Sequence, residues 1–171
     1  MVELITVMIL IGILGGIGAS RFFDGAAFEN RAYADQVKTI LRYAQKLAIT
    51  QNRSIFVRTD GNRFAVCSAA GCGASSIIVA PSGSNSGSRA TRISCLQNNI
   101  YTANWMCEGR PDTVNVAGTV GNGFAFDALG RPYVINSNNS TTLLAAQVSL
   151  TFTSGSNSSK ITVWPETGYV Q

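Results

Sequence analysis

The sequence of 171 residues contains no histidine. Histidine is the usual proton-transfer group near neutral pH and the commonest metal ligand in proteins. Its absence excludes Ser/His/Asp and Cys/His nucleophile pairs and most transition-metal sites. We therefore expect a protein that is not an enzyme and that binds no metal and no cofactor. A site built on lysine or on carboxylates is the open catalytic alternative.

Charge is also scarce in this chain. Charged residues make up 13% of it, the net charge is +4, and 10 of the 13 basic residues are arginine. Six basic residues and three acids lie between Arg21 and Arg53, whereas Lys160 is the only basic residue after Arg131. No basic stripe marks the C-terminal part as a nucleic-acid surface, so we expect no nucleic acid among the partners.

Polar residues are nearly absent from residues 1–20, which read MVELITVMILIGILGGIGAS. About 20 helical residues span the ~30 Å hydrocarbon core of a bilayer. No basic residue precedes the apolar run, and the run is longer than that of a usual signal peptide, which is typical of a retained anchor. We predict a single transmembrane segment over residues 1–20, with the orienting positive charges on a leader that precedes Met1. Glu3 is its one charge, and a carboxylate in an apolar segment is costly unless it is paired.

The pattern becomes amphipathic over residues 21–52. Apolar residues recur at spacings of three and four from Tyr33 to Ala48, and the charged residues turn away from them. This predicts that one helix runs from near Met1 to about Gln51, with an apolar first half and an amphipathic second half. The glycines from Gly12 to Gly25 each cost up to ~1 kcal/mol of helix stability, so the first half could unwind locally.

The apolar period changes to two after Asn52, in a segment rich in Ser, Asn, Thr and Gly, which favours β structure with polar turns. The sequence predicts a hairpin over residues 54–68, a surface loop over 82–88, and strands over 123–126, 133–136, 147–153 and 160–164. Shorter strands are predicted near 77–80, 113–116 and 167–170. We predict an α+β fold in which the long N-terminal helix packs on an antiparallel β-sheet head formed by residues 53–171.

The chain has four cysteines, Cys67, Cys72, Cys95 and Cys107. Their spacing lacks the C-x-x-C pairs that a zinc site usually needs. Beside a membrane-targeting segment, an even number of cysteines indicates two disulfides formed in an oxidising compartment. Three pairings are possible, and we favour Cys67 with Cys72 and Cys95 with Cys107, because this pairing closes the shortest loops.

Two further groups of residues could be mistaken for sites. The acids Asp60, Asp112 and Asp127 stand beside turn sequences, so we interpret them as turn residues rather than as ligands. Trp105 and Trp164 could stack on a ligand, but core packing is the expected role of an isolated tryptophan.

The order of features around Glu3 is specific. A Met1-Val2-Glu3-Leu4-Ile5 start leads into an apolar run, then into an amphipathic helix and a β-rich head with cysteines. This order resembles the type IV pilin and pseudopilin superfamily, whose prepilin-like N-terminal methylation motif follows a leader that ends in glycine. Met1 stands at the aliphatic position of that motif, so the resemblance implies that the leader and two mature residues precede Met1. It also implies that Glu3 contacts the N-terminus of a neighbouring subunit.

The head carries a second resemblance. Residues 41–57 (LRYAQKLAITQNRSIFV), 124–134 (FAFDALGRPYV), 147–153 and 160–171 are similar to the GspH/FimT class of minor pilins and pseudopilins. Within this class the chain looks most similar to a minor pilin of MSHA-type pili. The resemblance implies a low-abundance subunit that primes or caps a surface pilus and supports adhesion.

The resemblance also implies partners and a location. The partners would be major and minor pilin subunits, the inner-membrane assembly platform and, for the precursor, a prepilin peptidase. The subunit would be a single-pass inner-membrane protein with a periplasmic head, and afterwards part of a cell-surface pilus. Two alternatives are a minor pseudopilin of a type II secretion system and a DNA-binding minor pilin of a competence system. The weak C-terminal basicity argues against the second alternative.

Overall fold

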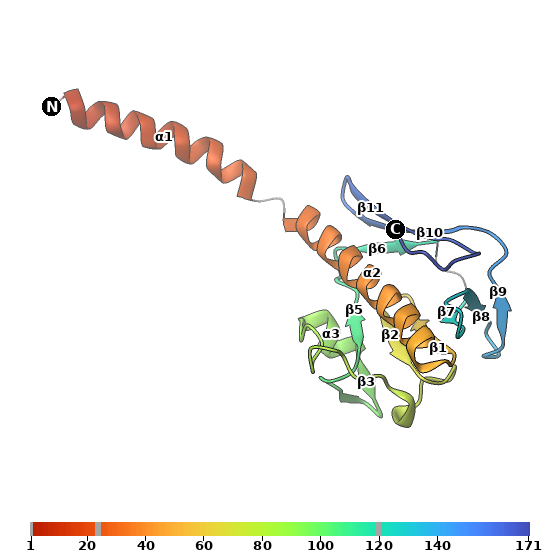
Figure 1. The fold of residues 1–171 in the computed structure, drawn as a ribbon. Helices are drawn as coiled ribbons and strands as arrows, with labels where there is room; N and C mark the ends of the chain where they lie inside the picture. The colour runs from red at the N-terminus through yellow and green to blue at the C-terminus, as the bar shows by residue number, and fades with distance from the viewer. Residues whose placement is uncertain (1, 23–24, 119–120) are drawn as a thin grey trace.

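We describe the chain from a computed structural model, which gives the backbone of residues 2–22, 25–118 and 121–171 and their side chains except those of residues 16–22 and 26. Two helices open the chain, α1 (Val2–Phe22) and α2 (Gly25–Gln51). Figure 1 shows α1 reaching away from the head, whereas α2 lies along it. The prediction of one unbroken helix concerns residues 23 and 24, which lie outside the described residues.

The head is built mainly from short antiparallel strands. It also contains a 3-10 turn, η1 (Ala74–Ser76), and a short helix, α3 (Arg89–Ser94). The strands are β1 (Ile55–Thr59), β2 (Arg63–Cys67), β3 (Leu96–Gln97), β4 (Ile100–Tyr101), β5 (Cys107–Gly109), β6 (Asn115–Ala117), β7 (Gly123–Phe126), β8 (Pro132–Ile135), β9 (Thr141–Leu143), β10 (Val148–Ser154) and β11 (Asn157–Val163).

The strands form two larger sheets and one hairpin. The six-stranded sheet has the order β5-β2-β1-β7-β8-β9, the three-stranded sheet has the order β11-β10-β6, and β3 pairs with β4. All these pairs are antiparallel. The turn between β1 and β2 contains Gly61 at φ +85, a conformation that glycine adopts without strain. The α+β class with a helix on an antiparallel head is therefore confirmed.

α2 packs one face on both sheets. This face is buried and carries the apolar residues that recur at helical spacing: Tyr33, Ala34, Val37, Ile40, Leu41, Ala44 and Ala48. These residues share one core cluster with side chains of β1, β7, β10 and β11. The ring of Tyr33 meets that of Phe152 edge-on, with a centroid distance of 5.8 Å and an interplanar angle of 74°. A second, smaller cluster surrounds Trp105 and the cysteines.

The strand predictions hold where the apolar pattern is long. The hairpin over 54–68, the loop over 82–88 and the strand over 123–126 are confirmed, and β10 with β11 matches the predicted C-terminal hairpin. The strands predicted near 77–80 and 167–170 are wrong as strands, because these residues form single bridges, Cys67 to Ile77, Val79 to Trp105 and Val163 to Val170. The sequence reading missed α3, β5 and β9, which are six residues or fewer in length.

We predict that Phe152→Ala lowers the free energy of unfolding by about 3–5 kcal/mol, because it leaves a cavity beneath α2. Phe152 is fully buried, whereas Leu129 has an exposed fraction of 72% and makes Leu129→Ala a matched control with an effect of at most about 0.5 kcal/mol. Denaturant unfolding of the full chain in detergent, followed by tryptophan fluorescence, measures both variants. Equal losses in the two variants would contradict this description of the core.

Candidate functional site

α1 presents an apolar surface to its surroundings. Its ten large apolar residues between Val2 and Leu14 have exposed fractions from 49% to 76%. A helix that is apolar on all sides is normally buried, and soluble monomers rarely expose a large apolar patch. Burying this surface would require an apolar partner. It is the first candidate site of the chain.

Glu3 is the only charged residue among the described side chains of α1, and it is exposed in the first turn. A carboxylate there interacts favourably with the positive end of the helix dipole. The hydroxyl of Thr6 donates to the backbone carbonyl of Glu3 at 2.9 Å, which holds this turn in place. Contact between Glu3 and the N-terminus of a neighbouring subunit concerns a second chain, so that role stays a prediction.

Two negative findings concern the described part of the chain. No helix there combines the length and the apolar character needed to cross a membrane. Nor do the residues described hold a group of three or more His, Cys, Asp or Glu side chains that could bind a metal ion. The transmembrane role of residues 1–20 therefore stays a prediction.

Two polar side chains of α2 connect the helix to the C-terminal part of the head. The guanidinium group of Arg42 donates two hydrogen bonds to the carbonyl of Val170, at 3.0 and 2.8 Å. The side-chain amide of Gln45 donates to the carbonyls of Gly130 and Thr167, at 3.0 and 2.7 Å. Arg42 was expected to turn away from the head, and this interpretation was incomplete. These bonds fix the end of the chain along α2.

The cysteines form the pairs Cys67–Cys72 and Cys95–Cys107. Their Cα separations, 5.3 and 5.9 Å, lie in the usual range for a disulfide. The second bond encloses the β3–β4 hairpin, whose turn residues Asn98 and Asn99 both have positive φ. Asparagine tolerates this conformation better than most residues, which allows a two-residue hairpin turn. The bond therefore attaches the β3–β4 hairpin to β5.

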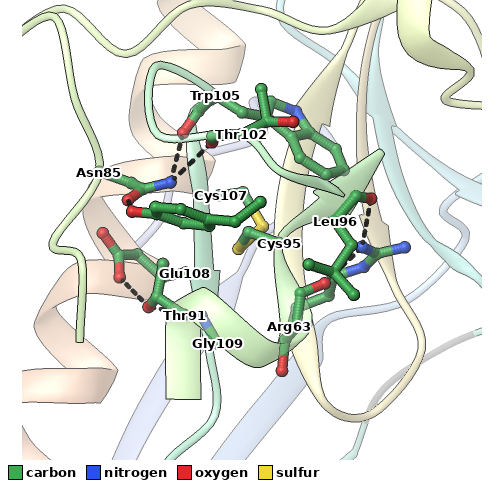
Figure 2. The surroundings of a disulfide bond; sticks show 12 residues. Arg63, Asn85, Thr91, Cys95, Leu96, Thr102, Trp105, Cys107, Glu108 and Gly109 are labelled. Atoms are coloured by element: carbon green, nitrogen blue, oxygen red, sulfur yellow. Dashed lines mark hydrogen bonds between the residues drawn. A yellow bond between two sulfur atoms is a disulfide. The ribbon is translucent and has the colours of Figure 1, made fainter. Parts of the chain in front are cut away.

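Glu108 on β5 binds the segment that leads into α3. Its carboxylate accepts hydrogen bonds from the backbone N–H of Ser86 at 2.8 Å, from the Ser86 hydroxyl at 2.5 Å and from the Thr91 hydroxyl at 2.8 Å. Figure 2 shows Glu108 and Thr91 facing one another on one side of the Cys95–Cys107 bond. On the same side, the amide of Asn85 donates to the carbonyls of Thr102 and Trp105. The described partners of Glu108 and Asn85 all lie between residues 86 and 105, so this network holds that part of the chain together.

The two tryptophans differ. Trp105 is fully buried, its indole N–H donates to the Val66 carbonyl at 2.9 Å, and the guanidinium carbon of Arg63 lies 5.3 Å from its ring centroid. The prediction that Trp105 packs in the core is confirmed. The same prediction for Trp164 is wrong, because 44% of it is exposed. Trp164 directly follows the last residue of β11 and precedes a turn at residues 165–167.

A cleft of about 780 Å³ lies between α3, the β1–β2 turn and residues 110–113. Its wall contains Arg63, Arg89 and Arg110, and the guanidinium groups of Arg63 and Arg110 already bind the protein. Arg63 pairs with Asp60 at 3.2 Å and donates to the Ser94 carbonyl, and Arg110 donates to the carbonyls of Gly61 and Val114. Two of the three arginines in the cleft wall therefore hold the loops together, whereas Arg89 lies on the same wall with an exposed side chain.

Asp127 organises the turn between β7 and β8. Its carboxylate accepts hydrogen bonds from the backbone N–H groups of Leu129 and Arg131, both at 2.9 Å, and pairs with the Arg131 guanidinium at 2.8 Å. Partial burial of the carboxyl acts to raise its pKa, but the bonds from Arg131 and Leu129 outweigh burial and hold the pKa below its usual range. The interpretation of Asp127 as a turn residue is confirmed. Asp60 likewise accepts a bond from the N–H of Asn62, at 2.9 Å.

No protein-family model and no curated protein matches the chain. Among solved structures, the chain is similar to the type IV minor pilin FimU of Pseudomonas aeruginosa, with 13% identity, a TM-score of 0.48, and coverage of 82% of this chain and 90% of that one.

The chain is also similar to the minor pseudopilin EpsH from the type 2 secretion system of Vibrio cholerae. Here the identity is 11% and the TM-score is 0.46, with coverage of 84% of this chain and 94% of that one. Both TM-scores lie below 0.5, so function is inferred below from the residues of this chain.

We predict that Asp127→Asn lowers the melting temperature at pH 6 and that the difference from the wild type shrinks below about pH 4. A carboxyl whose pKa is depressed in the folded state stabilises the fold above its unfolded pKa, and this contribution is lost as the pH falls through the folded pKa. Melting curves of both proteins between pH 7 and pH 3 test this. A constant difference over the whole range would contradict it.

Proposed function

We propose that the chain is a minor subunit of the type IV pilin kind, with a structural rather than a catalytic role. The observation that carries this proposal is the contrast between its first two helices. α1 exposes its large apolar side chains, whereas α2, which begins three residues after the end of α1, buries one apolar face in the head. The apolar side chains of α1 do not pack on the head, so we infer that they pack against apolar surroundings outside it.

An apolar helix can occupy two environments in succession. In a membrane its side chains contact lipid, and in a filament they contact the helices of other subunits. Because both surroundings are apolar, little hydrophobic burial changes when the subunit leaves the lipid. We propose that α1 first anchors the subunit in the inner membrane, with the head in the periplasm, and then packs in the core of a surface filament.

Glu3 specifies how the helices pack. An isolated carboxylate among packed apolar helices is costly, but a carboxylate paired with a neighbour's N-terminal amine is tolerated and fixes the register between them. On this proposal the partners are other pilin subunits, the inner-membrane assembly platform and, for the precursor, a prepilin peptidase.

The resemblance of residues 41–57 and 124–134 to the GspH/FimT class supports the narrower proposal. We propose a low-abundance subunit that primes or caps a pilus of the MSHA type and supports adhesion. The same segments are compatible with a minor pseudopilin of type II secretion, and the genes beside the locus distinguish the two systems. A DNA-binding role in competence is less favoured, because no basic residue lies between Arg131 and Lys160.

We predict that Glu3→Gln reduces incorporation into surface filaments at least about tenfold and leaves the head folded, because the amide lacks the charge that pairs with an amine. Asp35→Asn is the matched control, since Asp35 is an exposed carboxylate of α2. Quantifying each variant in sheared pili and in membranes, by immunoblot against the head, measures the effect. If Glu3→Gln is incorporated like the control, the assembly role of Glu3 is refuted.

A further inference from the structure

The protein covers two of the outer edges of its larger sheets. At β5, α3 lies so close that a Cβ on Gly109 would clash with the Ala90 carbonyl oxygen, and the Thr91 hydroxyl accepts a hydrogen bond from the N–H of Gly109. At β11, Thr162 and Gln171 exchange two backbone hydrogen bonds, at 3.0 and 2.9 Å. Covering an edge in this way prevents pairing with another chain.

The edge at β9 is different. The N–H of Leu144 donates to the Pro132 carbonyl, and the N–H of Asn136 donates to the Ser140 carbonyl. Backbone groups alternate in direction along an antiparallel strand, so these bonds place the N–H and C=O of Thr141 and Leu143 on the side away from β8. None of the hydrogen bonds recorded among the described residues uses these four groups. Figure 1 shows β9 at the outer edge of the sheet.

Nothing in the sequence of β9 protects this edge. Lysine, inward-pointing charges and proline commonly prevent an exposed edge from pairing. No charged residue lies between Arg131 and Lys160, and no proline follows Pro132 within this stretch. All three residues of β9 are exposed, and 49% of Leu143 is accessible, whereas the adjacent Leu144 is buried in the core. The edge therefore combines outward backbone groups with an apolar side chain and no charged residue of its own, and the guanidinium of Arg58 on β1 is bound to Asn139 in the turn before β9.

We propose that the β9 edge is a docking site for an extended strand from the head of a neighbouring subunit, which adds to the six-stranded sheet by backbone hydrogen bonds. Strand addition uses main-chain bonds for affinity and alternate side chains for specificity. The added strand is expected to be uncharged and to place an apolar residue beside Leu143. This inference rests on the proposed function, because it takes the occupant from the same filament.

The occupant is a different surface of a neighbour rather than the β9 edge of a second copy. Two β9 edges would pair through a two-fold axis, which is an isologous contact. Subunits whose apolar helices enter one membrane with the same orientation, and then one filament, repeat head to tail, and such repetition uses heterologous contacts.

The test compares two variants of one residue in the full chain. Leu143→Pro removes the outward N–H, and an edge strand tolerates proline when that N–H faces away from the sheet. Leu143→Ala keeps the N–H and shortens the side chain. Each variant is expressed with the other pilus subunits, and its incorporation is quantified in sheared pili. We expect Leu143→Pro to be incorporated at least about tenfold less than the wild type, and Leu143→Ala to stay within about threefold of it. The melting temperature of each variant in detergent shows whether the head is still folded.

Amide hydrogen exchange of the wild-type chain gives an independent readout. The amides of Thr141 and Leu143 should exchange at least about tenfold more slowly in detergent-solubilised assemblies than in the chain alone, and those of the β3–β4 turn should not change. Normal incorporation of a folded Leu143→Pro variant, or unchanged exchange at β9, would overturn the inference. Slower exchange in the chain alone at high concentration would instead indicate self-pairing and would also overturn it. The proposed function is tested separately by Glu3→Gln. If that variant is incorporated normally, the proposed function fails, whatever the outcome for the β9 edge.

Discussion

The head depends on the contact between α2 and the two sheets. Tyr33, Val37 and Leu41 stand one turn apart on the helix and are almost completely buried. Ala44 and Ala48 continue this face with small side chains, which allows the sheet to approach the helix closely. The two larger sheets both bury their apolar side against this one helix face, in a single core cluster. Removing α2 would therefore leave both sheets without the layer that covers them.

The same constraint explains the division of the N-terminal region. α2 satisfies its apolar face within the chain and leaves Arg31, Asp35 and Lys46 exposed to solvent. Over residues 2–15, α1 exposes its apolar side chains, and the proposed function takes lipid or other subunits as the surroundings that stabilise it. The covalent connection between the helices thus joins a folded head to a segment whose environment can change. This arrangement requires the head to fold without help from α1.

The elements that local patterns encode were predictable. The periodicity of α2, the Asp60-Gly61 turn and the alternating runs of β7, β10 and β11 each act within a few residues, and the structure contains all of them. α3 and β9 were not predictable, because α3 is six residues long and is held by the contact of Thr91 with Glu108, and β9 has three residues without apolar alternation. The exposure of Trp164 depends on which layer lies above it, and no local pattern encodes this. Glu3 was identified from the sequence as the one charge in the apolar run, whereas its proposed partner was implied only by the resemblance to a known family.

The two proposed contacts of the subunit differ in the kind of information they carry. Apolar packing of α1 is strong but not directional, so by itself it allows neighbouring helices to slide and rotate. A buried carboxylate such as Glu3 fixes their register along the filament, because it can pair at one position only. Neither contact fixes the rotation of the head about the helix, since the head reaches outside the apolar core. A strand edge does so, because backbone hydrogen bonds require the two strands to lie in one plane at a spacing of about 4.8 Å. On the proposal made above, the uncovered edge at β9 would supply the directional contact that the apolar helix lacks.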